Sequence, residues 1–266
     1  IGARRCTTPL PVLTGEHFLD GKVDELVIYN KAISDSEVQD HYQEGVANLC
    51  VDAPSNLVSW WPGDGDATDF EDGNDGVLTN GATFAAAKVG QGFSLDGVND
   101  CVALGNPTNL QLNDAFTIDL WFNKQSGPIG YPNLVGHGTG GWAFGISNEP
   151  ANVGKLFISQ SGQPPFLTGT TVFQDGVDYH VAVTHAGPNG ETKLYVNGAQ
   201  EASTLTSPTF TFPNGLSIGR DDCAGGAFHG TIDEVQIFAR ELGAAEILAI
   251  YNADSAGKCK HTYTHP

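Results

Sequence analysis

One stretch of the sequence occurs twice, and this duplication constrains the fold more than any other feature. The later copy runs from residue 228 to Cys259, and the earlier copy runs from residue 18 to Cys50. Asp24 corresponds to Asp233 and Cys50 to Cys259, with one shared offset (233 − 24 and 259 − 50 both give 209). A fixed offset is typical of chains built from copies of one structural unit. The sequence therefore predicts the end of one domain, followed by one complete domain with the same end.

The duplication divides the 266 residues. Residues 1–50 are predicted to be the C-terminal segment of a preceding repeat, residues 51–259 a complete domain, and residues 260–266 a tail. Residues 51–259 suffice to bury a sizeable core as a single all-β unit. The chain has no Met and no visible signal peptide, so we expect a processed or excised piece of a longer protein.

The charge balance excludes one class of partner. Acidic residues number 31 against 12 Lys and Arg, and the formal net charge is −19. Nucleic-acid binding needs clustered basic side chains, and the sequence has no such cluster. No apolar run of the length needed to cross a bilayer occurs either, so we expect no membrane insertion. An acidic surface suits solubility and the binding of divalent cations.

Short β-rich runs separated by turns fill residues 51–259. The clearest is 115–124, where apolar residues alternate onto one face: Phe116, Ile118, Leu120 and Phe122. Asn197 and Gly198 between two such runs indicate a hairpin turn. A single short helix is predicted over 245–253. About a dozen short strands with one helix indicate two packed sheets.

Four of the five cysteines lie at equivalent positions of the two copies. The duplication predicts disulfides between Cys6 and Cys50 and between Cys223 and Cys259, each joining a strand to the end of the terminal helix. Disulfides indicate an oxidising, extracellular or cell-surface setting. Cys101 is left over, as a buried small apolar residue or as half of a bridge to another chain.

Several segments in the same order resemble laminin-G-like jelly-roll domains of the concanavalin A-like lectin/glucanase superfamily. The resemblance covers residues 57–252 and is carried by segments 57–62, 65–69, 74–81, 93–100, 115–121, 179–183, 194–198 and 230–235. Residues 18–45 resemble the end of another such domain. The resemblance implies an all-β fold, a two-sheet antiparallel jelly-roll sandwich with a short C-terminal helix.

The same resemblance implies a structural Ca²⁺, held by an aspartate of the last strand and by early loops. Carried over to this sequence, the ligands are Asp66, Asp69, Asp96, Gly97 and Asp233. Hard oxygen ligands of this kind are those that Ca²⁺ prefers. The alternative is that these aspartates form turns by accepting hydrogen bonds from nearby backbone amides.

No catalytic arrangement is visible. Glycosidases of this superfamily carry paired carboxylates on one strand as Glu-x-Asp-x-Glu or Glu-x-Asp-x-x-Glu, and the sequence has neither pattern. The acidic pair Asp233 and Glu234 belongs to the duplicated terminal stretch. We therefore expect no enzymatic activity. The four tryptophans, which are Trp60, Trp61, Trp121 and Trp142, are expected mainly in the core, with sugar stacking as the less favoured alternative.

Two functions remain open. The duplicated ends and the disulfides favour a non-catalytic extracellular structural or adhesive repeat, with residues 1–50 docking on identical chains or adjacent repeats in a head-to-tail filament. The alternative for residues 1–50 is an excision remnant that packs on its own chain. The superfamily favours a calcium-dependent carbohydrate-binding module of a larger extracellular protein or glycoside hydrolase, with glycans or extracellular proteins as partners. Fold resemblance alone does not decide between them.

Overall fold

The computed structural model describes residues 28–34, 37–38, 50–126, 131–188, 190–205 and 208–260. The chain divides into two compact units, Ile1–Gly45 and Val46–Pro266. In the first unit, the Ser34 amide donates to Glu37 Oε2 at 2.7 Å and the Glu37 amide to Ser34 Oγ at 3.2 Å, a capping box that begins a helix. Residues 28–30 are not in a strand.

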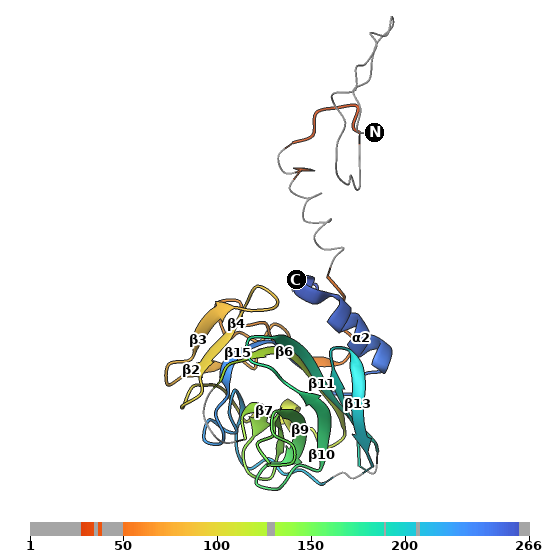
Figure 1. Ribbon diagram of the computed structural model, residues 1–266. Coiled ribbons are helices and arrows are strands. Elements are labelled where there is room, and N and C mark those ends of the chain that lie inside the picture. The colour runs from red at the N-terminus through yellow and green to blue at the C-terminus, as the bar shows by residue number, and fades with distance from the viewer. Residues whose placement is uncertain are drawn as a thin grey trace, which may run out of the picture. The chain divides into compact units, whose positions relative to one another are not determined.

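The described strands of the second unit form two antiparallel sheets (Figure 1). The eight-stranded sheet contains β1 (Leu57–Trp61), β3 (Thr83–Ala86), β4 (Gln91–Asp96), β6 (Ala115–Lys124), β11 (Asp178–Ala186), β12 (Thr192–Val196), β13 (Ala199–Thr204) and β15 (His229–Phe238). The seven-stranded sheet contains β2 (Val77–Thr79), β5 (Cys101–Gly105), β7 (Asn133–His137), β8 (Trp142–Ile146), β9 (Lys155–Gln160), β10 (Leu167–Val172) and β14 (Leu216–Ile218). The helices are α2 (Ala244–Asn252) and the 3₁₀ turns η1 (Thr108–Leu110) and η2 (Asp254–Ala256).

The strand order confirms the predicted jelly-roll sandwich. The larger sheet runs β13-β12-β11-β6-β15-β4-β3, and the smaller runs β10-β9-β8-β7-β14-β5-β2. Strand β15 is long enough to pair with β4 through residues 229–232 and with β1 through residues 235–238. Strand β15 thus lies beside β6, β4 and β1, and β14 lies between β7 and β5, so several neighbouring strands are distant in sequence, as Greek-key connections require.

The main core lies between the sheets. The predicted alternation of β6 is confirmed, because Phe116, Ile118, Leu120 and Phe122 all point into this core and are at most 2% exposed. In this core they pack with Trp142 and Phe144 of β8, which belongs to the other sheet. Such residues contribute about 1.5–3 kcal/mol each when fully buried.

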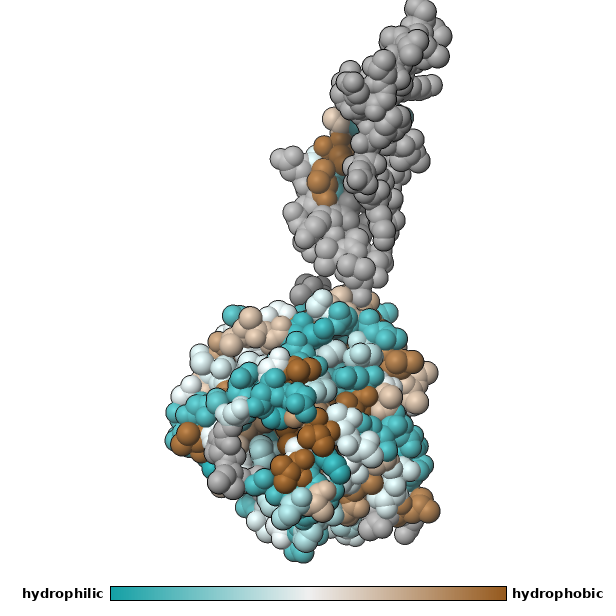
Figure 2. Space-filling view, in the orientation of Figure 1, coloured by the Kyte–Doolittle hydropathy of each residue, from teal (hydrophilic) through white to brown (hydrophobic). Residues whose placement is uncertain are grey.

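A smaller core covers the outer face of the eight-stranded sheet. Ile247 and Ile250 of α2 pack there with Leu242, Tyr195 and Phe238. The helix begins one residue earlier than predicted, and the Glu246 carboxylate accepts a hydrogen bond from the Gly243 amide at 2.9 Å. Elsewhere the visible surface is mainly hydrophilic, with only small hydrophobic patches (Figure 2). No helix among the described residues has the length and apolar character needed to cross a membrane.

The predicted disulfide pairing is wrong. The structure joins Cys50 to Cys259 and Cys101 to Cys223, with Cα separations of 5.0 and 5.6 Å. Cys223 therefore does not pair with Cys259, Cys50 does not pair with Cys6, and Cys101 is not a free thiol. Cys6 itself lies outside the described residues.

Strand pairing explains both bridges. Strand β14 pairs with β5, so the loop after β14 returns over the start of β5 and brings Cys223 to Cys101. Val51 forms a parallel bridge with Lys258, which places the neighbouring Cys50 and Cys259 together. The duplication suggested partners within each copy, whereas contacts between distant strands determine the pairing.

Candidate functional site

A pocket of about 330 Å³ lies on the outer face of the seven-stranded sheet. We call it the outer pocket. Alternation along β8 and β9 turns Phe144 and Ile158 into the core, and the intervening residues face outward. The lining residues are Tyr131, Asn133, Ala143, Glu149, Phe157, Ser159, Ser161, Gly162, Gln163, Pro164, Pro165, Asp221 and Gly226.

Small residues of β8 form the floor of the outer pocket. Ala143 pairs with Ser159, and Gly145 pairs with Phe157. A Cβ atom added at Gly145 would lie 2.3 Å from the Pro132 carbonyl oxygen and 3.1 Å from the Phe157 ring. A side chain at Gly145 would therefore clash with the backbone at Pro132 and Asn133 and would crowd the Phe157 ring.

Two aromatic rings form that wall. Tyr131 and Phe157 meet edge to face, with centroids 5.9 Å apart and an interplanar angle of 84°. Phe157 is buried, whereas Tyr131 is 42% exposed. The Tyr131 hydroxyl donates to Glu149 Oε1 at 3.3 Å. The wall therefore offers an accessible aromatic surface, in which the hydrogen bond to Glu149 orients the Tyr131 hydroxyl.

Unpaired oxygen atoms lie beside these rings. Asp221 Oδ2 accepts a hydrogen bond from the Ser161 hydroxyl. Asp221 Oδ1 and Asn133 Oδ1 are buried and have no hydrogen-bond partner among the described residues. Burial raises the pKa of Asp221 to about 6, although the Ser161 hydroxyl opposes the rise. Buried acceptors without partners are uncommon and suit the hydroxyl groups of a ligand.

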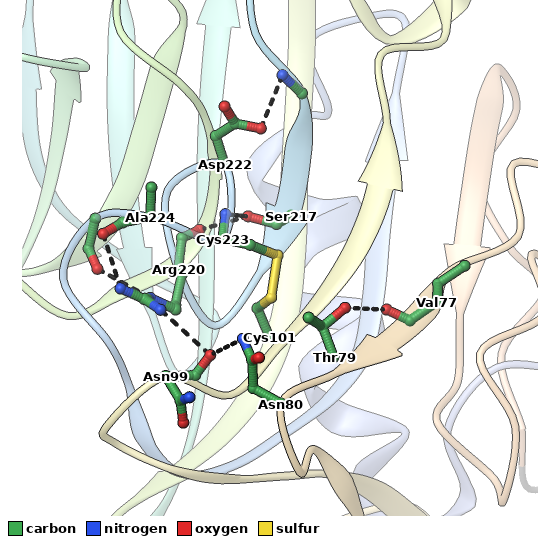
Figure 3. Close-up of a disulfide and its surroundings, with 12 residues drawn as sticks. Val77, Thr79, Asn80, Asn99, Cys101, Ser217, Arg220, Asp222, Cys223 and Ala224 are labelled. Atoms are coloured by element: carbon green, nitrogen blue, oxygen red, sulfur yellow. Dashed lines mark hydrogen bonds between the residues drawn. A yellow bond between two sulfur atoms is a disulfide. The ribbon is translucent and has the colours of Figure 1, made fainter.

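The loop after β14 carries Asp221, and a disulfide and Arg220 fix this loop. Figure 3 shows the disulfide and the Arg220 hydrogen bonds. The Cys101–Cys223 bridge ties this loop to β5. The Arg220 guanidinium donates to the carbonyl oxygens of Ala224 at 2.7 Å, Gly225 at 3.0 Å and Asn99 at 3.2 Å. The Cys101–Cys223 bond and the Arg220 guanidinium thus fix the loop that positions the Asp221 carboxylate.

The backbone of the same loop also packs against Tyr131. A Cβ atom added at Gly226 would lie 1.9 Å from the Tyr131 carbonyl oxygen. The Asn133 amide donates to the Gly226 carbonyl oxygen at 3.3 Å. The loop therefore fixes the acidic and aromatic sides of the outer pocket together.

Acidic groups determine the charge of the outer pocket. Its lining, all of it within the described part of the chain, includes Glu149 and Asp221 but no Lys, Arg or His. Negatively charged ligands would be repelled, and hydroxyl or ammonium donors would be favoured.

A second hollow of about 420 Å³ lies beside Trp60 and Phe70. Its Trp60 ring is only 2% exposed, and the indole N–H already donates to Glu234 Oε2 at 3.1 Å. The other tryptophans are at most 3% exposed. The expectation that tryptophans serve mainly as core residues is therefore confirmed, and the outer pocket is the better candidate.

The structure does not bring the predicted calcium ligands together. Asp66 Oδ1 accepts from the Thr68 amide at 3.0 Å, and Asp96 Oδ1 accepts from the Val98 amide at 2.8 Å, in the turn where Gly97 has φ +75°. Asp69, 5% exposed, accepts three backbone amides: Trp60 at 2.8 Å, Asn74 at 3.0 Å and Glu71 at 3.1 Å. Asp66, Asp69 and Asp96 therefore fit the alternative, in which these aspartates accept hydrogen bonds from backbone amides.

Asp233 is deeply buried, and its Oδ2 accepts from the Val89 amide at 2.7 Å. Burial raises the pKa of Asp233 to about 8. Within the described residues, no group of three or more His, Cys, Asp or Glu side chains could hold a metal. The predicted ligand set therefore does not fit a calcium ion, and calcium binding stays a prediction.

The residues of the outer pocket were not among the predicted site residues. Phe157 and Ser159 could have been found as outward positions of a strand. Tyr131 and Asp221 lie in loops, which carry no periodic signal, and only the fold brings them together.

Comparisons with known proteins agree with this architecture. A family model described as the concanavalin A-like lectin/glucanases superfamily matches residues 96–248. No curated protein matches the sequence.

Similar solved structures show the same fold. One is domain 4 of AbnA, a GH43 extracellular arabinanase from Geobacillus stearothermophilus, in complex with arabinotriose. Its TM-score is 0.59 at 19% identity, over 73% of this chain and 97% of that one. A Trypanosoma rangeli sialidase mutant gives 0.55 at 17% identity over 82% of this chain, which spans only 38% of the sialidase. The binding domain of Paraclostridial Mosquitocidal Protein 1 gives 0.57 at 15% identity, over 74% and 52% of the two chains.

Proposed function

Because the chain belongs to the concanavalin A-like lectin/glucanase superfamily, we propose that its second unit is a glycan-binding module and that the outer pocket is the binding site. The observation that carries the proposal is the half-exposed Tyr131 ring beside the unpaired acceptors of Asp221 and Asn133. A sugar ring has an apolar face that suits an aromatic surface, and its hydroxyl groups donate to carboxylate and amide oxygens.

The charge of the site indicates the ligand class. Glu149 and Asp221 would repel sialic and uronic acids, whose carboxylates would find no basic residue in the lining. Neutral sugars are the better ligands, because their hydroxyl groups satisfy the unpaired acceptors without adding charge. The arabinanase domain in complex with arabinotriose is an instance of a neutral ligand in a similar fold.

The same pocket contains two carboxylates, which is also the number that a glycosidase requires. We assign both to binding, because the sequence lacks the paired motifs of the catalytic members. The module then holds its glycan without a catalytic step. A binding experiment with an assay for new reducing ends separates the two functions, since an enzyme would release them and a binding module would not.

The two disulfides favour a secreted or cell-surface protein, since such bonds persist in oxidising compartments. Glycan binding also agrees with an adhesive role in an extracellular array. Assembly through residues 1–50 stays a prediction, since most of these residues lie outside the described part of the chain.

A neutral and acidic glycan panel, followed by calorimetry with the best ligand, tests the proposal. Tyr131→Ala is expected to weaken binding about tenfold or more, equivalent to about 1.4 kcal/mol, and Asp221→Ala by a similar factor. Phe70→Ala is the matched control, since Phe70 is exposed to a similar degree (37%) in the other hollow. Binding that is unaffected by Tyr131→Ala and Asp221→Ala would place the site elsewhere.

A further inference from the structure

A cluster of charged side chains is buried on the outer face of the eight-stranded sheet. Asp119 and Glu234 are 0% exposed. The Lys258 side chain is 1% exposed, and the Lys260 side chain is 33% exposed. Buried charges are costly unless each has an opposite partner, so their arrangement needs a physical explanation.

The two lysines lie between the carboxylates. Lys258 Nζ is 3.5 Å from Glu234 Oε2 and 3.9 Å from Asp119 Oδ1. Lys260 Nζ is 3.8 Å from Glu234 Oε1 and also contacts Asp64 Oδ2. Each oxygen of Glu234 therefore faces a different ammonium group.

The ring of Trp60 completes the arrangement. Its Nε1 donates to Glu234 Oε2 at 3.1 Å. The ammonium groups of Lys258 and Lys260 lie 5.9 and 5.7 Å from the ring centroid. Cations at such distances from an aromatic ring are attracted to it.

A β-bulge brings Glu234 to this face. Ile232 and Val235 both point into the main core, and the pairing of β15 with β6 shifts between Asp233 and Gln236. Glu234 has φ +54°, in the left-handed region. The extra residue turns both Asp233 and Glu234 outward, whereas regular alternation would point one of them into the core.

The lysines are held by a short segment, residues 257–260, which we call the C-terminal strap. The Val51 amide donates to the Gly257 carbonyl oxygen at 3.1 Å, and the Cys259 amide donates to the Val51 carbonyl oxygen at 3.0 Å. The Cys50–Cys259 bridge fastens the strap between the two lysines. The strap therefore delivers two ammonium groups to a fixed place.

We propose that Lys258 and Lys260 are the resident cations of this acidic cluster, so that its charge is balanced without a divalent ion. A calcium ion would need six to eight oxygen ligands. Here the carboxylates of Glu234, Asp119 and Asp64 face ammonium groups instead. The folded module is therefore stable without calcium, and its stability depends on the strap.

Thermal unfolding of the whole chain tests this assignment. The melting temperature of the wild type is expected to be the same in EDTA and in millimolar Ca²⁺. Lys258→Met keeps an apolar stem but removes the charge, and it is expected to lower the melting temperature by about 5 °C or more. The matched control is Lys193→Met, which removes a lysine of β12 that is paired with Glu241 and whose side chain is 23% exposed.

A second substitution identifies the interaction as one of charge. Glu234→Gln in the Lys258→Met background is expected to recover part of the lost stability, because the carboxylate nearest the lost ammonium group is then neutral.

Two results would overturn the proposal. One is a wild-type melting temperature that falls in EDTA and recovers with Ca²⁺. The other is a Lys258→Met variant that melts like Lys193→Met. If Lys258→Met does not fold, the melting temperatures of Lys260→Met and of the wild type in EDTA test the proposal instead. Lys260 is partly exposed, so its substitution is expected to leave a folded protein.

Discussion

His137 donates a hydrogen bond from Nε2 to the carbonyl oxygen of Leu110, 3.1 Å away, because a carbonyl oxygen can only accept. The imidazole is fully buried and meets the rings of Trp142 and Phe212, each with centroids 4.7 Å apart. Burial lowers the pKa of His137 to about 4. The side chain is therefore neutral at pH 7.

This histidine makes the fold sensitive to acid. Its ordinary pKa is 6.5 and its folded pKa is about 4, so the unfolded chain binds more protons between these values. Stability is expected to fall as the pH is lowered from 6.5 to 4, by about 3 kcal/mol at most. Urea unfolding at pH 7 and pH 4.5 measures the loss. His137→Gln should reduce the pH dependence of stability, and a dependence equal to that of the wild type would contradict the assignment.

Glycan affinity is expected to fall as the pH is lowered through about 6, the folded pKa of Asp221. Protonation removes acceptor capacity from the carboxylate that receives the sugar hydroxyl groups. The titration of Asp221 affects folding stability in the opposite direction to that of His137. Because the folded pKa of Asp221 is raised, its contribution to stability decreases as the pH rises from 3.8 to about 6. Calorimetry between pH 5 and 8 measures the affinity. Asp221→Asn should flatten the profile, and an unchanged profile in that variant would assign the titration to another group.

The Cys101–Cys223 bridge closes 122 residues of sequence. Replacing both cysteines by Ala is expected to cost about 2–4 kcal/mol of stability and to weaken glycan binding, because the bridge holds the loop that carries Asp221. Peptide mapping without reduction checks the pairing, and denaturant unfolding checks the cost. Normal glycan affinity in the folded double variant would show that Arg220 alone is enough to hold the loop.

Asp69 supports the loop between β1 and β2 through three backbone amides. Asp69→Ala leaves these donors without their acceptor and is expected to destabilise the fold by about 2–4 kcal/mol. Asp66→Ala removes one exposed hydrogen bond and should cost less than about 1 kcal/mol. Chemical denaturation of both variants makes the comparison, and similar losses would mean that Asp69 has no special supporting role.

Deletion of residues 1–45 tests the predicted assembly element while keeping Cys50. If the segment docks on identical chains, the full chain should show a mass that rises with concentration in light scattering, and the deletion variant should be monomeric. Glycan affinity should be unchanged, because the outer pocket belongs to the second unit. A full chain that is already monomeric at high concentration would refute head-to-tail assembly.

The sequence predicts the regular parts of the fold well, because local patterns determine them. Strand β6 occupies the predicted residues 115–124, and α2 lies one residue from its predicted position. Asn197 and Gly198 have φ +49° and +77°, as a tight hairpin turn requires. Each of these features depends on residues that are close together in the chain.

Features that depend on contacts between distant segments could not be predicted. The outer pocket combines Tyr131, Phe157 and Asp221 from separate loops and strands. Cys101 pairs with Cys223 because β5 lies beside β14, which the duplication does not reveal. The bulge at Glu234 reverses the expected direction of one side chain and thereby creates the charge cluster.

The Cys50–Cys259 bridge also determines how the domain responds to tension. Its Cα atoms are 5.0 Å apart, and the residues between them form a covalently closed loop. A pulling force applied to the chain before Cys50 and after Cys259 passes through the sulfur–sulfur bond and bypasses both sheets. While the bridge is intact, such a force cannot unravel the sandwich. Reduction would place the sheets directly under load and add the length of the whole domain to the extended chain.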